Sequence, residues 1–63
     1  MNMSLSAFLA PIDEGEIIRI TDHNSKRTMF EGKKAMYESF NVDFNVDVVT
    51  VWTSNGRIII EVA

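Results

Sequence analysis

Two runs rich in β-branched residues near the C-terminal end form the clearest pattern in this chain. They cover Val46 to Thr53 and Arg57 to Val62, and Ser54-Asn55-Gly56 separates them. Asn-Gly between two such runs favours a type I′ turn, because both central residues of that turn need a positive φ and these two residues tolerate it. The pattern therefore predicts an antiparallel hairpin with Asn55-Gly56 as its loop.

A two-residue loop fixes which residues of this hairpin face each other. The predicted pairs, counted from the turn, are Ser54 with Arg57, Thr53 with Ile58, Trp52 with Ile59, Val51 with Ile60, Thr50 with Glu61 and Val49 with Val62. One face then carries a continuous apolar stripe, which we expect to be the core side. Its members are Val49, Val51, Ile58, Ile60 and Val62, with Thr53 as the one polar residue. The other face is mixed and holds the Trp52–Ile59 pair beside Val48.

An earlier pair of runs, Glu16 to Thr21 and Arg27 to Glu31, predicts a second hairpin. The segment between them, Asp22 to Lys26, contains Asp, Asn and Ser side chains that bond to their own backbone and favour a turn. Ile18 and Ile20 alternate with polar residues, as a half-buried strand requires. The length of the loop is ambiguous, so the sequence does not fix the register of this hairpin.

The segment between the hairpins, Gly32 to Phe40, predicts a short amphipathic helix. It lacks β-branched residues, and Met36 and Phe40 lie four positions apart, so both would face the sheet. Asn41 to Asn45 is then a connector, from which Val42 or Phe44 reaches inward.

These elements predict one α+β domain with the order ββαββ. Residues 16–63 form its core, in which two antiparallel hairpins make a sheet with one short helix packed on it. Residues 1–15 form an N-terminal segment that we expect to be partly flexible.

Composition limits the classes of protein to which the chain can belong. It has 63 residues, no cysteine, six Lys and Arg, and nine Asp and Glu, for a net charge of −3. A domain of this size has a thin core, and without cysteine it forms neither a disulfide nor a thiolate metal site. The opening residues lack a basic region, and no apolar run approaches the ~20 residues of a membrane span. We therefore expect a soluble cytoplasmic protein, and the negative charge argues against general DNA binding.

The reactive residue types form no recognisable site. His23 is the only histidine, so the usual zinc sites are excluded, and we interpret it as a solvated turn residue. No serine has the Gly-x-Ser-x-Gly context of an exposed nucleophile. The acidic residues match no cation-binding loop, whether in the cluster before the first strand or in the pair Asp43 and Asp47. The sequence thus predicts no catalytic residue, no metal and no cofactor, and a protein that is not an enzyme.

Three segments carry a family resemblance. They are Ile18-x-Ile20-x-Asp22-x-Asn24-Ser25, Met29-Phe30-Glu31-Gly32-Lys33 and Asn55-Gly56-x-Ile58-x-Ile60-Glu61-Val62. Together, over roughly residues 16 to 63, they resemble small uncharacterised proteins of Gram-positive bacteria and their phages. The resemblance implies a fold and assigns no functional residue. Separately, Leu5 to Leu9 is similar to the start of some phage tail-assembly chaperones, but the remainder of the chain does not follow that family.

The Trp52 face leads to the first functional hypothesis. An aromatic–aliphatic pair, Trp52 with Ile59 next to Val48, on a face that the core does not need is typical of a protein contact. The module would then bind a protein partner, with a homodimer as one form. Two alternatives stay open. The N-terminal segment, with Met3, Leu5, Phe8 and Leu9, could cover this face as a second small core, or a second copy could pair with this face or with the edge of the final strand.

The second hypothesis is a nucleic-acid-binding accessory protein. Lys26, Arg27, Lys33 and Lys34 would form its basic patch if the first turn and the start of the helix converge, and Tyr37 or Trp52 could stack on bases.

Overall fold

The structure, a computed structural model, describes residues 3–39 and 46–63 of the chain. Its elements are β1 (Met3–Ser4), α1 (Leu5–Leu9), β2 (Ile17–Asp22), β3 (Thr28–Lys33), α2 (Lys34–Ser39), β4 (Asp47–Ser54) and β5 (Arg57–Val62). The five strands form one sheet in the order β1-β4-β5-β2-β3. Neighbouring strands are antiparallel except β2 and β5, which run parallel. The chain is therefore a small α+β domain with a mixed sheet and two short helices.

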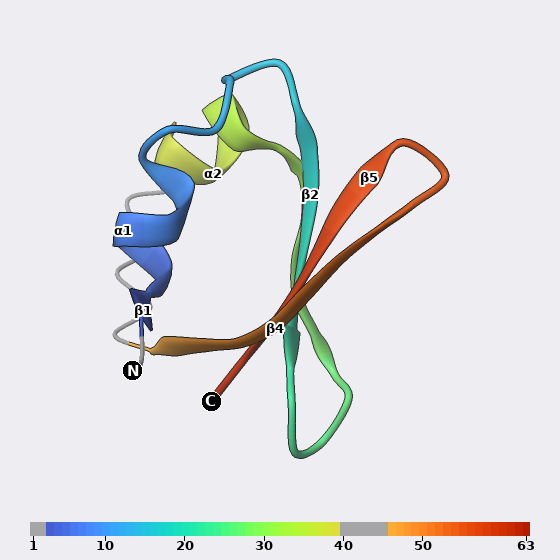
Figure 1. The fold of residues 1–63 in the computed structure, drawn as a ribbon. Coiled ribbons are helices and arrows are strands. Elements are labelled where there is room, and N and C mark those ends of the chain that lie inside the picture. Colours follow the sequence, from blue (N-terminus) through green and yellow to red (C-terminus); the bar gives the residue numbers. More distant parts are fainter. Residues whose placement is uncertain (1–2, 40–45) are drawn as a thin grey trace.

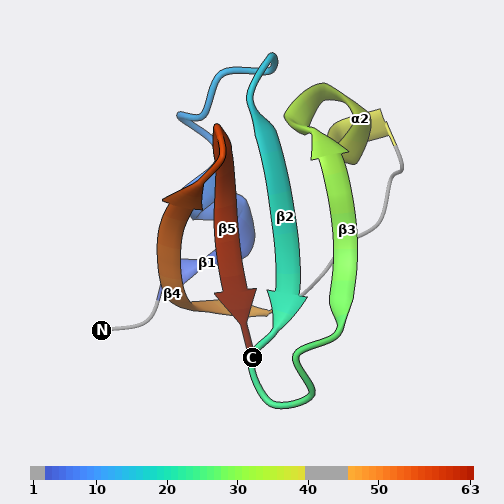
Figure 2. The same ribbon diagram turned by 90° about the vertical axis from the view of Figure 1, so that its right-hand side faces the viewer.

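Both helices lie against the same face of the sheet (Figure 1). Figure 2 looks onto the opposite face, where β4, β5, β2 and β3 lie side by side, with α1 behind them and α2 beside the end of β3. One face of the sheet is thus covered by helices, and no described element covers the other.

The core lies between the sheet and α1. The parallel register sets Ile18 beside Ile58 and Ile20 beside Ile60, so the apolar side chains of the two central strands share the helix-facing side. The buried residues of this core are Leu5, Leu9, Ile18, Ile20, Phe30, Ile60 and Val62. Helix α1 begins with Ser4 as its N-cap, whose hydroxyl accepts a hydrogen bond of 3.2 Å from the Ala7 amide.

The hairpin of β4 and β5 confirms the prediction at its turn. Asn55 and Gly56 have φ values of 52° and 76°, as a type I′ turn requires, and the predicted pairs hold from Ser54–Arg57 to Thr50–Glu61. The last predicted pair is wrong. Val62 faces Val48, because the register shifts between Val48 and Thr50 and leaves Val49 outside the regular pairing.

The predicted core stripe of this hairpin is correct on β5 and wrong on β4. Ile60 and Val62 are fully buried, whereas Val49 and Val51 are 46% and 37% exposed. The reason is the short reach of α1. The amide of its first residue, Leu5, donates a hydrogen bond to the carbonyl of Val46 just before β4, and the helix does not extend over the outer half of that strand.

The first hairpin is confirmed, with β2 and β3 as its strands. Its turn is stabilised by Asp22, whose carboxylate accepts hydrogen bonds from the Ser25 amide at 2.9 Å and the Ser25 hydroxyl at 2.7 Å. A register shift between Ile20 and Thr21 interrupts the pairing, which is the irregularity that the sequence left undetermined.

Helix α2 begins later than predicted, because β3 continues through Gly32 to Lys33. The expectation that Met36 packs on the sheet is wrong, since it is 52% exposed. Instead, the inward positions are Lys34, which is buried, and Tyr37. The ring of Tyr37 packs edge to face on that of Phe30, with 5.4 Å between the two ring centroids. Phe40 and the predicted connector, including Val42 and Phe44, lie outside the described residues.

The ββαββ order with one helix is also incomplete, because residues 3–9 add β1 and α1 to the domain. Leu5 and Leu9 are 0% and 3% exposed, so the N-terminal segment belongs to the core. A thin core explains this arrangement, since the central isoleucines need a cover that α2 alone does not supply.

We expect Leu5→Ala and Met36→Ala to have unequal effects on stability. Loss of the fully buried Leu5 side chain leaves a cavity and should lower the free energy of unfolding by about 2–5 kcal/mol. The exposed Met36 should change it by no more than about 0.5 kcal/mol. Urea unfolding followed by circular dichroism measures both, and equal losses would contradict the packing of α1.

Candidate protein-interaction surface

The side of the sheet turned away from both helices is called the open face below. It is built by the outward side chains of β2 to β5. They are Ile17, Arg19, Thr21, Thr28, Glu31, Lys33, Thr50, Trp52, Ser54, Arg57, Ile59 and Glu61.

A transverse row of the open face places Trp52 next to the most buried apolar residue of that side. Ile59 lies directly opposite Trp52 on one neighbouring strand and Arg19 on the other, and it is only 8% exposed. Ile59 does not belong to the helix-side core cluster, so its burial comes from the large side chains that flank it. Trp52 itself stays 44% exposed.

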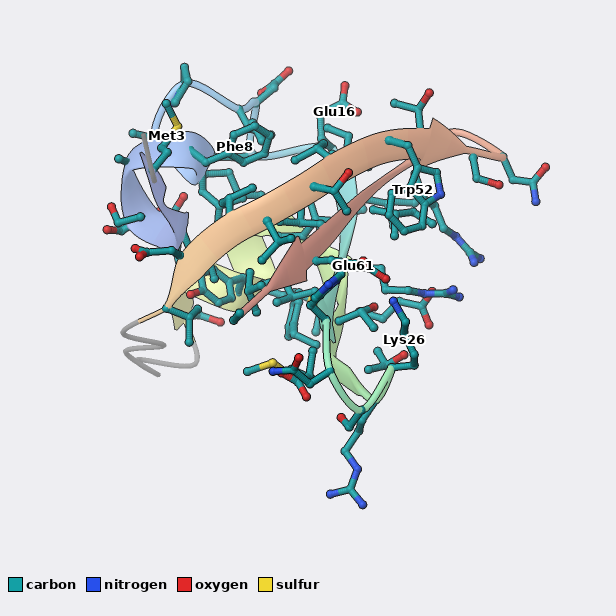
Figure 3. The ribbon with its side chains drawn as sticks, turned by 60° about the horizontal axis from the view of Figure 1, so that its bottom comes forward. Met3, Phe8, Glu16, Lys26, Trp52 and Glu61 are labelled. Carbon is teal, nitrogen blue, oxygen red and sulfur yellow. The ribbon has the colours of Figure 1, made fainter. Side chains whose placement is uncertain are left out.

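The described part of the N-terminal segment does not cover this row. Figure 3 shows Trp52 and Glu61 on one side of the sheet, and Met3 and Phe8 on the other. Leu5 and Leu9 are likewise used in the helix-side core. Within the described residues, Trp52 is therefore a surface residue and not the centre of a second core.

Val48 does not lie where the sequence predicts it, on the open face with Trp52 and Ile59. The bulge at Val49 turns Val48 to the helix side, where it is half-buried and packs against the core. The same bulge exposes Val49, and Val51 beyond it is exposed as well. The outer half of β4 thus presents Trp52 on the open face and exposes Val49 and Val51, although the sequence pattern predicts both valines in the core.

Charged side chains form ion pairs beside Trp52 and Ile59 on the open face. Glu31 Oε2 accepts hydrogen bonds from Arg19 Nη2 at 2.8 Å, Arg19 Nε at 3.0 Å and Arg57 Nη1 at 3.2 Å. These groups are between 35% and 44% exposed, so each pair adds little to stability. They do join β2, β3 and β5 across the open face.

A second pairing surrounds Glu61, whose side chain is 10% exposed. Its two oxygens lie 3.0 Å from His23 Nδ1 and 3.2 Å from Lys26 Nζ. The hydrogen bond with His23, followed by that with Lys26, lowers the pKa of the Glu61 carboxyl below its ordinary value. His23 is thus a half-exposed turn residue with a defined partner, and not merely a solvated one.

Asp22 supports the same turn from its other side. The Ser25 hydroxyl and amide, in that order, lower the pKa of the Asp22 carboxyl by donating hydrogen bonds to it.

The four basic residues of the nucleic-acid hypothesis do not form one patch. Lys26 and Arg27 lie in the turn before β3, whereas Lys33 and Lys34 follow at its far end, about 20 Å away along an extended strand. Lys34 is 7% exposed, and its ammonium donates to the carbonyls of Ile12 at 2.6 Å and Ala10 at 3.3 Å. Lys34 therefore has a structural role between α2 and the loop after α1.

An open groove lies between the two helices beside Lys34. It encloses about 440 Å³ and is lined by Ser6, Leu9, Ala10, Glu14, Lys34, Tyr37 and Glu38. Its one cation is engaged by the two carbonyls and by Glu38 at 3.4 Å.

The described residues show neither a metal site nor a membrane-spanning helix. They contain no group of three or more His, Asp or Glu residues that could hold a metal ion. No helix in the described part of the chain is long and apolar enough to cross a membrane. Comparisons with protein-family models, curated proteins and solved structures found no match. The resemblance to proteins of Gram-positive bacteria and their phages stays a prediction, and function has to be inferred from the surface itself.

We expect Lys34→Met to destabilise the domain and Lys33→Met to leave it nearly unchanged. The first change removes a buried ammonium from two carbonyls and Glu38, which should lower the free energy of unfolding by about 1–3 kcal/mol. The second removes an exposed charge from the same strand end. Urea unfolding at neutral pH separates the two, and a larger loss for Lys33→Met would contradict the structural role of Lys34.

The lowered pKa of Glu61 predicts an acid-sensitive contribution to stability. A carboxyl whose pKa is lower in the folded chain stabilises the fold above its ordinary value of 4.5, and this stabilisation disappears as pH falls through the folded value. Glu61→Gln should therefore be less stable at neutral pH and should lose less stability than the unaltered chain on acidification. Unfolding at a series of pH values tests this, and parallel stability curves for the two chains would refute it.

Proposed function

We propose that this chain is a small non-catalytic protein-interaction module whose contact surface is centred on Trp52. The observation that carries the proposal is the position of this side chain, which lies 44% exposed over the buried Ile59 on a face that no described element covers. Tryptophan is enriched among the residues that dominate binding energy at protein interfaces.

The surroundings of Trp52 support the same function. Val49 and Val51 of the same strand also expose apolar side chains, and Val51, which pairs with Ile60, does so on the other face. Binding through a sheet surface or a strand edge requires no reactive group. The charged pairs around Glu31 and Glu61 would form the polar rim of such a contact, as is usual at interfaces.

The alternative, nucleic-acid binding, has less support from the arrangement of side chains. A nucleic-acid site needs a continuous basic stripe, and the four candidate residues are divided between the two ends of β3. Lys26 is also paired with Glu61, and Lys34 is enclosed.

Site-specific photo-crosslinking tests the proposal in living cells. We expect a photoreactive phenylalanine derivative at position 52 to form covalent adducts with protein, because this side chain would lie inside the contact. The matched control is position 36, since Met36 is similarly exposed, at 52%, but lies on α2. Mass spectrometry then identifies what is attached.

Three outcomes would contradict the proposal. They are the lack of any protein adduct at position 52, an adduct with nucleic acid there, and equal adducts at positions 52 and 36. Circular dichroism on the purified variants confirms that both are folded, which the exposure of both side chains leads us to expect.

A further inference from the structure

We infer that the outer edge of β4 pairs antiparallel with β4 of a second copy, with the two-fold axis passing at Trp52. This inference rests on the proposed function, because it names the partner of the same surface. It follows from three features of β4: its unpaired backbone groups, its uncharged sequence and the length of edge that β1 leaves free for pairing.

Within residues 3–39 and 46–63, the backbone edge of β4 is unpaired over most of its length. β1 pairs with β4 only at Asp47 and Val48, and among the described residues nothing pairs with the outer edge from Val49 to Ser54. The final strand, β5, has no such edge, because β4 and β2 flank it on both sides. The sequence-based hypothesis of pairing through the edge of the final strand is therefore wrong, and the available edge belongs to β4.

The turn type shows which backbone groups point outward. In a hairpin with a two-residue type I′ loop, the residues that flank the loop form a hydrogen-bonded pair, and this pattern alternates along the strand. The amides and carbonyls of Ser54 and Trp52 therefore point to β5. Those of Val51 and Thr53 point to the outer edge and present two donors and two acceptors.

The sequence of this edge lacks the usual features that prevent pairing. Val49 to Ser54 contains no charge, no proline and no glycine. Natural edge strands are usually protected by Lys, Pro, bulges or inward charges. The opposite edge of this sheet has such protection, since β3 contains Glu31 and Lys33. Each edge strand also has one register shift, so the charges are what distinguish the two edges.

A second copy of the chain fits this edge without charge repulsion. Antiparallel pairing about a two-fold axis perpendicular to the sheet places the open faces of both copies on the same side. Residues directly opposite each other must then have their side chains on the same face of the sheet. This holds only if the two-fold axis passes through a residue of β4, and not midway between two residues.

The position of β1 and the outward backbone groups together restrict these registers. An axis at Val51 would place Ser54 of the second copy opposite Val48, where Met3 already pairs. An axis at Trp52 avoids this conflict and places Val51 opposite Thr53 of the second copy, so that the outward backbone groups of both chains meet. The two Trp52 residues then face each other at a non-hydrogen-bonded position, where side chains approach most closely and aromatic pairs add to stability.

Solution mass measured from micromolar to millimolar concentration tests the inference. We expect the unaltered chain to form a dimer and Thr53→Lys to weaken dimerisation at least tenfold, because the change places charge at the edge without altering Trp52. The matched control is Thr28→Lys, a change of the same kind at an exposed position of β3. It should leave the dimer unchanged.

Amide hydrogen exchange on the unaltered chain provides a test that needs no variant. The amides of Val51 and Thr53 should become protected as the concentration rises, while the already paired amide of Trp52 should change much less. The inference is overturned if the chain stays monomeric at all concentrations, if Thr53→Lys dimerises like the control, or if these two amides show no dependence on concentration.

The result also separates the two proposals. A monomeric chain that still crosslinks to a different protein through position 52 would overturn the β4 pairing and leave the proposed function intact. A monomeric chain without protein adducts at position 52 would overturn both.

Discussion

The parallel pairing of β2 with β5 determines how the rest of this small domain is arranged. It brings Ile18 and Ile20 beside Ile58 and Ile60 at the centre of the sheet, with their side chains on one face. The helices must cover that face to exclude water from the isoleucines, so both lie on the same side (Figure 1). Because β5 is enclosed between β2 and β4, the hairpin that contains Trp52 becomes the outer part of the sheet, and none of the described elements covers its second face (Figure 2).

The use of scarce apolar residues makes the exposure of Trp52 informative. A domain of 63 residues buries a small core, and this one draws on Leu5 and Leu9 from the N-terminal segment to complete it. It also buries the aliphatic part of Lys34 at the start of α2, while the ammonium of this residue donates to two carbonyls of the loop after α1. A chain under this constraint nonetheless leaves its largest side chain on the surface, which is difficult to explain by packing and is readily explained by a contact.

Local chemistry made part of this structure predictable. Asn55-Gly56 determines its own turn, and through the turn it determines the pairing as far as Thr50. Beyond Thr50 the bulge at Val49 depends on how β4 meets β1 and the C-terminal residue, and no residue pattern within the hairpin encodes it. The pairing of β2 with β5 is similarly long-range. The pairing of Trp52 with Ile59 lies within the part that the turn determines, so it was predictable from the sequence. The exposure of Val51 depends on where α1 lies and was not.

The two edges of the sheet differ in how well they are protected against pairing with another strand. Both edges belong to the same small domain, so a general need for solubility acts equally on both. Both strands have an irregular register, β3 against β2 and β4 at Val49, but β3 also carries Glu31 and Lys33, while Val49 to Ser54 carries no charge. An unprotected edge of six uncharged residues with high strand propensity would pair with unrelated chains unless a specific partner occupied it. The lack of protection on β4 is therefore best explained by an occupant, and a second copy of the same strand satisfies its register, its charge and its symmetry.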